Sequence, residues 1–222
     1  MPSVPMFPLN AVVFPGVVVP LHIFEDRYRA LVRDLLADPE PAGHVFGIVA
    51  IREGYEVGDH GVQSSYRVGT LVQLTRHERY DDGRFDIEVV GRQRLRLMSM
   101  ETGGEYFRGE VELLTDEEAD EATPIAVTAA LGVYEEYRAL VGALRGEDPI
   151  AGDLPQDPEY LSYTLAASSL LPMPERQRLL EADSAAERLL LLAGILREEV
   201  RSIRALPSLP ATELARTRWS PN

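Results

Sequence analysis

The chain has 222 residues, enough for one large domain or two small lobes at roughly 150 residues per domain. Apolar residues make up 45% and charged residues 26%, which excludes a wholly disordered chain. Acids outnumber bases 36 to 22, and the net charge of -14 argues against binding to a duplex phosphate backbone. The absence of cysteine excludes disulfides, thiolate zinc sites, iron–sulfur clusters and cysteine nucleophiles.

All 22 basic residues are arginine, so the chain has no chemistry that depends on lysine. This excludes a P-loop lysine, a serine–lysine dyad and a Schiff-base lysine. The Gly-x-Ser-x-Gly nucleophile elbow is also missing, and no two of the four histidines follow the His-x-x-x-His spacing of a metal site. We therefore expect no catalytic residues, no metal and no cofactor.

The amino terminus carries no export or membrane signal. Residues 1–9 contain no basic residue, so the positive region of a signal peptide is missing. The apolar run over residues 11–21 is interrupted by prolines and is shorter than the ~20 residues that span a bilayer. The sequence predicts a cytoplasmic protein with no membrane partner.

The first half of the chain shows the patterns of strands and one helix. Apolar and polar residues alternate over 85–89, and Asp82-Gly83 just before them predicts a hairpin turn with 71–80 as the partner strand. Several short strands at close spacing predict a small, partly closed antiparallel barrel. A helix is expected over about residues 25–36, with four residues on its buried face: Phe24, Tyr28, Leu31 and Leu35.

The second half shows the patterns of helices. Thr123-Pro124 and Asp157-Pro158 are helix starts, and Ser184 with Glu187 forms a capping box. Two apolar stripes should face inward, the first made by Ala130, Val133, Tyr137, Leu140 and Leu144, the second by Leu189, Leu192, Leu196, Val200 and Ile203. The predicted fold class is α+β, with a β-rich lobe over 1–115, a helical lobe over 122–205 and a mobile tail over 206–222 that holds Trp219.

Charge is concentrated in two places. Residues 101–160 hold 16 acids and three arginines, and the run 116–121 is interpreted as a solvated linker or helix start, with a docking surface as the alternative. Arg92, Arg94 and Arg96 alternate along one predicted strand and share a face if no bulge intervenes. A phosphate or RNA contact is one interpretation of these arginines; pairing with strand acids such as Glu88 or Glu110 is favoured.

A family resemblance rests on the first 28 residues. The segments Phe7-Pro8-Leu9-Asn10, Val13-Phe14-Pro15-Gly16, Pro20-Leu21-His22-Ile23-Phe24-Glu25 and Arg27-Tyr28 strongly resemble the LON substrate-binding domain. Further agreement comes from Val68-Gly69-Thr70, Gly91-Arg92-Gln93-Arg94-Leu95 and Leu170-Leu171-Pro172. The resemblance covers roughly residues 4–205 and implies a PUA-like pseudobarrel followed by a helical bundle.

The resemblance also implies a role. It suggests a free-standing, non-enzymatic module that binds unfolded or exposed protein segments, as an adaptor or holdase in protein quality control, with a protease or chaperone as a further candidate partner. An RNA-binding PUA-like module and a hydrolase with an unrecognised site are the alternatives. No catalytic residue carries over, and a structural role is expected for Phe24, Glu25, Arg27 and Tyr28, with Phe24 and Tyr28 in the core.

A client could bind in a groove between the two lobes, because concave junctions are common binding sites. The candidate residues are aromatic or proline residues outside the clean helix and strand stripes. They are Phe14, Pro15, Tyr55, Tyr66, Tyr160 and Tyr163. The competing interpretation is that most of them close a permanent interface between the lobes.

Overall fold

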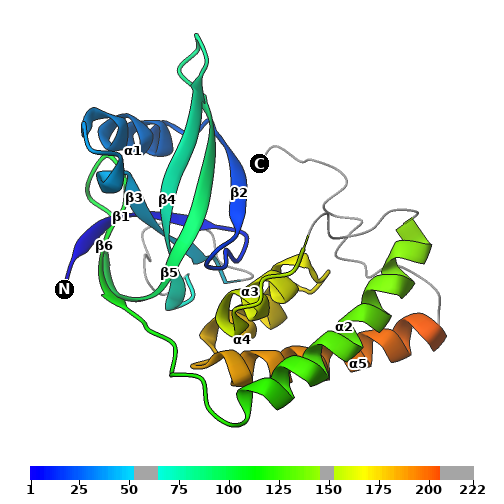
Figure 1. Ribbon diagram of the computed structural model, residues 1–222. Helices are drawn as coiled ribbons and strands as arrows, with labels where there is room; N and C mark the ends of the chain where they lie inside the picture. The colour runs from blue at the N-terminus through cyan, green and yellow to red at the C-terminus, as the bar shows by residue number, and fades with distance from the viewer. Residues whose placement is uncertain (53–64, 146–152, 206–222) are drawn as a thin grey trace. The chain divides into compact units, whose positions relative to one another are not determined.

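The computed structural model describes residues 1–52, 65–145 and 153–205 (Figure 1). The chain divides into two compact units, Met1–Thr115 and Asp116–Asn222. The described strands and one α-helix belong to the first unit, and four α-helices belong to the second. The α+β fold class is confirmed. Tyr55, the tail over 206–222 and Trp219 lie outside the described residues.

The first unit is built on a six-stranded sheet. Its strands are β1 (Ser3–Leu9), β2 (Val18–Ile23), β3 (Val45–Ala50), β4 (Val68–Arg79), β5 (Phe85–Glu101) and β6 (Arg108–Leu113). Their order is β2-β5-β4-β3-β1-β6, and a further β5–β6 pairing closes β1, β3, β4, β5 and β6 into a ring. The long β5 makes this possible, since its first part pairs with β2 and its last part with β6.

One pair in the barrel departs from the expected antiparallel arrangement. β1 and β3 run parallel, with Met6 opposite Gly47 and Leu9 opposite Ala50. Parallel neighbours need a long crossover connection. Here β2 and the helix α1 (Asp26–Ala37), followed by a 3-10 turn at Pro41–Gly43, supply it.

The hairpin between β4 and β5 forms where the sequence predicts it. The Tyr80 amide donates to the Arg84 carbonyl over 2.9 Å, and the Gly83 amide donates to the Tyr80 carbonyl over 3.0 Å. Gly83 has a φ of 86°, a conformation that glycine adopts without steric cost. The hairpin projects beyond the barrel (Figure 1).

The strands β1 and β3 are buried on both faces. Phe7, Phe46 and Ile48 belong to one cluster, which α1 joins through Tyr28, Leu31 and Leu35. The neighbouring Met6 and Val49 belong to another cluster with Leu95, Leu97 and Val111. Successive residues of a strand point to opposite faces, so β1 and β3 each contribute to both clusters.

The prediction that Phe24 lies on the buried face of the helix is wrong. Its side chain is 44% exposed, whereas Tyr28, Leu31 and Leu35 are buried. The helix begins at Asp26, with Glu25 in the extended conformation of an N-cap. Phe24 therefore precedes the helix and does not follow its period.

The second unit contains α2 (Thr123–Arg145), α3 (Pro158–Ser168), α4 (Met173–Glu181) and α5 (Ala185–Ala205). The Asp157 carboxylate accepts hydrogen bonds from the amides of Glu159 and Tyr160 over 3.0 and 3.1 Å, which caps α3 as predicted. The Glu187 amide likewise donates to the Ser184 hydroxyl over 3.1 Å, while the Glu187 carboxylate accepts from the Asp183 amide.

The inward stripe of α5 is confirmed, and that of α2 is rotated. Leu189, Leu192, Leu196, Val200 and Ile203 are all buried. On α2 the buried residues are Ala126, Ala130, Tyr134, Tyr137 and Val141, while Leu144 is exposed. Tyr134 can be buried because its hydroxyl hydrogen-bonds to the Ser168 hydroxyl over 2.9 Å.

Candidate functional site

The five predicted groove residues that the structure describes differ widely in exposure. Phe14, Pro15 and Tyr163 are buried, Tyr66 is partly buried, and Tyr160 is exposed. Phe14 and Pro15 form a turn that packs on β5: a Cβ at Gly91 would lie 2.2 Å from the Phe14 carbonyl oxygen. Because the six residues come from both units, the shared groove stays a prediction.

Tyr163 belongs to a buried polar cluster in the second unit that sequence reasoning missed. Arg188 is fully buried, and its Nη2 donates to Asp116 Oδ2 over 2.8 Å. The same guanidinium donates to the Ser162 hydroxyl and to the carbonyls of Leu179 and Ala182. Its Cζ lies 3.9 Å from the centroid of the Tyr163 ring, whose hydroxyl donates to Asp116 Oδ1 over 3.0 Å.

This cluster is structural rather than a site. These partners of Arg188 all lie within the second unit, and each guanidinium nitrogen donates at least one hydrogen bond, as a buried charge requires. Asp116, which begins the acidic run, is therefore part of the core and not of a solvated linker. The sequence did contain a signal for this burial. Arg188 lies three residues after Ala185 and four before Leu192, a spacing that places it on the apolar face of α5.

The family-motif residues around the start of α1 connect the helix to the barrel. Arg27 Nε lies 3.3 Å from Glu25 Oε2, and its guanidinium lies 5.2 Å from the centroid of the Phe107 ring, next to β6. Tyr28 stacks on Phe7 with ring centroids 3.8 Å apart. Burial, with a smaller contribution from the Glu25 charge, raises the pKa of Tyr28 to about 12.

The strand β2 is an edge of the sheet. Among the described residues it pairs with β5 alone, in the register Val18–Val90 to Ile23–Phe85. Val18, Pro20 and His22 alternate with the inward-facing Val19, Leu21 and Ile23, so they share the outer face of the strand. Val18 is 57% exposed, which leaves an apolar side chain beside an unpaired strand edge.

An aromatic cluster continues this outer face. The His22 ring lies 6.2 Å from both the Phe24 and the Tyr80 rings, and Phe24 and Tyr80 are both exposed. Asp86 holds the cluster: its carboxylate lies 2.5 Å from His22 Nδ1 and accepts from the Tyr80 hydroxyl over 2.5 Å. The hydrogen bond from Tyr80, followed by that from His22, lowers the pKa of Asp86, and the bond to Asp86 raises the pKa of Tyr80.

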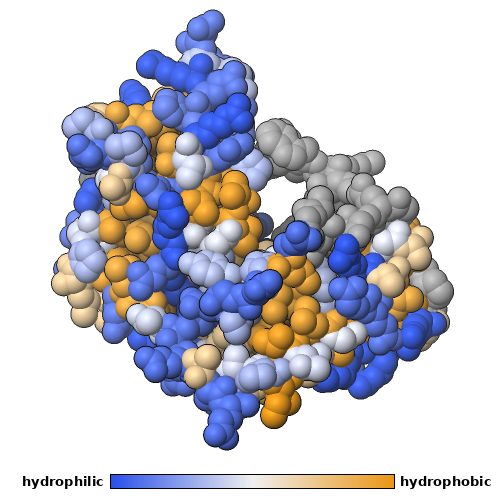
Figure 2. All heavy atoms as spheres, viewed as in Figure 1, coloured by the Kyte–Doolittle hydropathy of each residue, from blue (hydrophilic) through white to orange (hydrophobic). Residues whose placement is uncertain are grey.

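Together, Val18, Phe24 and Tyr80 place exposed apolar groups on one face of β2 and the hairpin. Figure 2 shows hydrophilic side chains over the projecting end of the hairpin and apolar ones on the body of the same unit. We call the surface made by Val18, Pro20, His22, Phe24 and Tyr80 the β2 surface. Exposed apolar groups beside an unpaired strand edge are what an extended peptide recognises.

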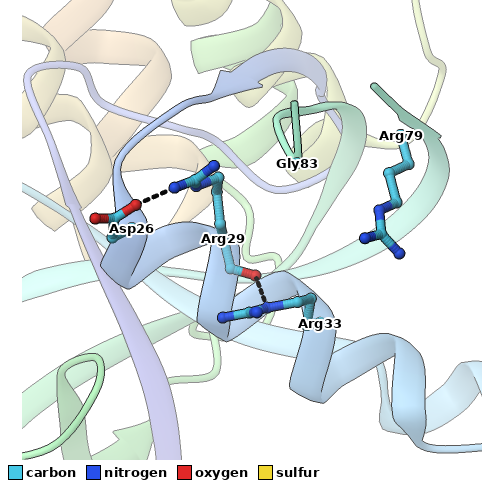
Figure 3. Close-up of a pocket in the computed structure, with 5 residues that line it drawn as sticks. All are labelled: Asp26, Arg29, Arg33, Arg79 and Gly83. Carbon is cyan, nitrogen blue, oxygen red and sulfur yellow. Dashed lines mark hydrogen bonds and ion pairs between the residues drawn. The ribbon is translucent and has the colours of Figure 1, made fainter. Parts of the chain in front are cut away.

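A second feature lies between α1 and the hairpin. A pocket of about 210 Å³ is lined by Asp26, Arg29, Arg33, Arg79 and Gly83 (Figure 3). Arg29 and Arg33 come from α1, and Arg79 comes from the end of β4. Arg29 forms an ion pair with Asp26 and donates to the Asp82 carbonyl over 3.0 Å, which ties the helix to the hairpin turn.

An adjoining pocket of about 310 Å³ shares Arg33 and Arg79 with the first. Its other lining residues are Leu36, Ala37, His77 and Phe85. We call the two pockets together the α1–hairpin groove. The groove is cationic at its first end and largely apolar at its second.

The expectation that three arginines of β5 share one face of the strand is also wrong. Arg92 and Arg96 are exposed, but Arg94 is buried, so the three do not share a solvent face. The cause is a bulge: Val72 faces Gly91 and Leu71 faces Gln93, which leaves Arg92 as the extra residue. Arg92 donates to the Gln73 side chain, and Arg96 forms a cross-strand pair with Glu112 at 3.0 Å in place of the suggested Glu88 or Glu110.

Metal binding has no support in the part of the chain that the structure describes. No group of three or more histidine, aspartate or glutamate side chains there could hold a metal ion. Within the same residues, no helix has the length and apolarity that a membrane crossing needs.

The family model for the ATP-dependent protease La (LON) substrate-binding domain matches residues 3–198. The chain belongs to this family. Lon protease of Escherichia coli (strain K12) is 28% identical over 200 residues, which are 89% of this chain and 25% of that protein. Lon protease 2 of Myxococcus xanthus is 26% identical over 223 residues, or 96% of this chain and 26% of that protein. The chain thus spans about a quarter of the length of these Lon relatives.

Two solved structures share the fold. The Lon N-terminal domain protein from Xanthomonas campestris has a TM-score of 0.60 and 24% identity, over 87% of this chain and 98% of that one. The N-terminal domain of the Mycobacterium avium complex Lon protease has a TM-score of 0.58 and 20% identity, over 90% of this chain and 98% of that one. The resemblance to the LON substrate-binding domain, inferred from residues 7–28, is confirmed.

Proposed function

We propose that this chain is a non-enzymatic substrate-recognition module that binds exposed, extended segments of other proteins as an adaptor or holdase. The main support for the proposal is the edge of β2 that no other described strand pairs with, flanked by the exposed apolar side chains of Val18 and Phe24. The family match to a substrate-binding domain supports the same role.

The backbone of β2 indicates how a segment would bind. The Gly91 amide donates to the Val17 carbonyl over 3.0 Å, so Val17 is a hydrogen-bonded partner of β5. In an antiparallel pair such positions alternate, and the backbone groups of Val18, Pro20 and His22 therefore face the free edge. An extended segment can pair with these groups as an added strand.

Pro20 limits the strength of this pairing. Proline has no amide hydrogen, so the middle of the free edge offers a carbonyl but no donor. Natural proteins use such prolines to prevent edge-to-edge aggregation. Binding at the β2 surface should therefore be weak and tolerant of sequence, which suits a module that samples many clients.

Backbone amide shifts during titration with an apolar ten-residue peptide test the proposal. The largest shifts should fall on residues 17–24, and Val18→Asp should weaken binding at least about tenfold, because it places a charge beside the docked apolar side chains. Leu190→Asp is the matched control, since Leu190 is an exposed leucine on α5 in the second unit. Shifts confined to α3 and α5, with no effect of Val18→Asp, would exclude the β2 surface.

A further inference from the structure

We propose that the α1–hairpin groove binds the free carboxyl terminus of a protein segment, with the carboxylate at Arg33 and Arg79 and the apolar last side chain against Leu36 and Ala37. The ligand class rests on the proposed function, because the carboxylate belongs to a protein segment. The groove itself is separate from the β2 surface.

The charge balance of the groove points to an anion. Arg29 is neutralised by Asp26, and the neighbouring hairpin arginines are paired, Arg84 with Asp82 at 2.7 Å and Arg76 with Glu88 at 3.6 Å. In the described part of the chain, no carboxylate lies within 4.0 Å of the guanidinium of Arg33 or Arg79. Arg33 Nε donates to the Arg29 carbonyl at 3.3 Å, and its two terminal guanidinium nitrogens have no hydrogen-bond acceptor among the described residues.

The position of these two arginines strengthens the argument. They line both pockets, from opposite walls: Arg33 from α1 and Arg79 from the last residue of β4 (Figure 3). The chain as a whole carries a charge of -14, so a general excess of positive charge does not explain two arginines that lack an acidic partner in the described ranges. Arginine binds carboxylates through parallel, charge-assisted hydrogen bonds.

The apolar residues at one end of the groove favour an anion that carries an apolar group. Leu36, Ala37 and Phe85 line the pocket that Arg33 and Arg79 also line. A carboxylate with an apolar side chain beside it matches this arrangement, whereas a polyphosphate would meet apolar surface and the repulsion of an acidic protein. Asp26 at the other end further disfavours a dianion.

The two proposed surfaces lie on opposite faces of the hairpin. Arg79 pairs with Phe85 and His77 with Ile87, residues that face the core under α1. Tyr80 and Asp86, by contrast, belong to the cluster on the outer face with His22. A variant in the groove therefore leaves the β2 surface intact, and the two can be tested independently.

The experiment uses the full chain and two fluorescent ten-residue peptides of the same sequence, ending in leucine, one with a free carboxyl terminus and one amidated. The free acid should bind about tenfold more tightly, the scale of a charge-assisted hydrogen-bonded contact. Combined Arg33→Gln and Arg79→Gln should remove this preference. Arg201→Gln is the control, because Arg201 is an exposed arginine on α5 that pairs with Glu198.

The outcomes separate this inference from the proposed function. Equal binding of both peptides, lost with Val18→Asp and unaffected by the arginine substitutions, overturns the carboxylate site and leaves the β2 surface standing. Absence of binding by either peptide overturns both. Displacement of the free acid by inorganic phosphate at lower concentration than by N-acetyl-leucine overturns the carboxylate assignment in favour of a phosphate ligand.

Discussion

Arg188 and Asp116 are 72 positions apart in the chain, yet Nη2 of the arginine lies 2.8 Å from Oδ2 of the aspartate. The pair joins the segment before α2 to the first turn of α5, with Tyr163 of α3 bound to both. Arg188, Asp116 and Tyr163 therefore connect three parts of the second unit.

Arg188→Met should destabilise the second unit by about 3–5 kcal/mol, because it leaves the Asp116 carboxylate buried without its partner. Urea denaturation followed by helical circular dichroism measures the loss. Arg178→Met is the control: its pair with Glu175 on α4 is exposed, and its loss should cost less than about 1 kcal/mol. Equal costs for the two variants would contradict the structural role of the cluster.

Tyr28→Ala should destabilise the first unit by about 3 kcal/mol, since it removes a ring that is 6% exposed and stacked on Phe7. Thermal unfolding measures the change. Tyr160→Ala, which truncates a half-exposed tyrosine on α3, should leave the melting temperature nearly unchanged. A Tyr28→Ala protein that melts at the wild-type temperature would show that this ring does not hold α1 to the barrel.

Alkaline pH should weaken the first unit through Tyr28. Its pKa is raised from 10.0 to about 12 in the folded protein, so folding disfavours the ionised phenol. The associated stability is present below about pH 10 and is lost as the pH rises through 12, by at most about 3 kcal/mol. The loss of stability can be measured as the urea concentration at the midpoint of unfolding between pH 10 and 12. Lysine titration does not interfere, because the chain has no lysine. Tyr28→Phe should show a shallower decline than the wild type.

Two glycine-to-alanine substitutions should change the free energy of unfolding in opposite directions. Gly91→Ala places a Cβ 2.2 Å from the Phe14 carbonyl oxygen, a backbone atom that cannot move away cheaply, and should destabilise the protein by about 2 kcal/mol or more. Gly132→Ala, on α2, meets nothing within 4 Å and should stabilise the helix by up to about 1 kcal/mol. Chemical denaturation of both variants is the measurement, and a stabilising Gly91→Ala would contradict the close approach of the turn.

Local patterns in the sequence were sufficient for much of the fold. Alternation over 85–89 and the Asp82-Gly83 turn identified the hairpin, and the spacing from Leu189 to Ile203 identified the buried face of α5. These features depend on neighbours within a few residues, so periodicity describes them well. The family resemblance, also carried by a short segment, was equally accessible.

Features set by distant contacts were not accessible in this way. The bulge that buries Arg94 depends on how β4 pairs with β5, and the burial of Asp116 depends on Arg188. The two arginines of the α1–hairpin groove are 46 positions apart in the sequence, 33 and 79, and only the packing of α1 on the hairpin brings them to one pocket. No spacing rule connects such residues.

The placement of β1 has a consequence for synthesis of the protein. This first strand lies between β3 and β6, with Ser3 opposite Glu110, so the ring closes through a contact between the beginning and the end of the first unit. A nascent chain that has not yet reached β6 carries β1 with one edge unpaired, and pairing across so long a loop is slow. The ring therefore cannot close until almost the whole first unit has been made, and until then β1 exposes an unpaired edge of the same kind as the β2 edge that we propose as a binding surface.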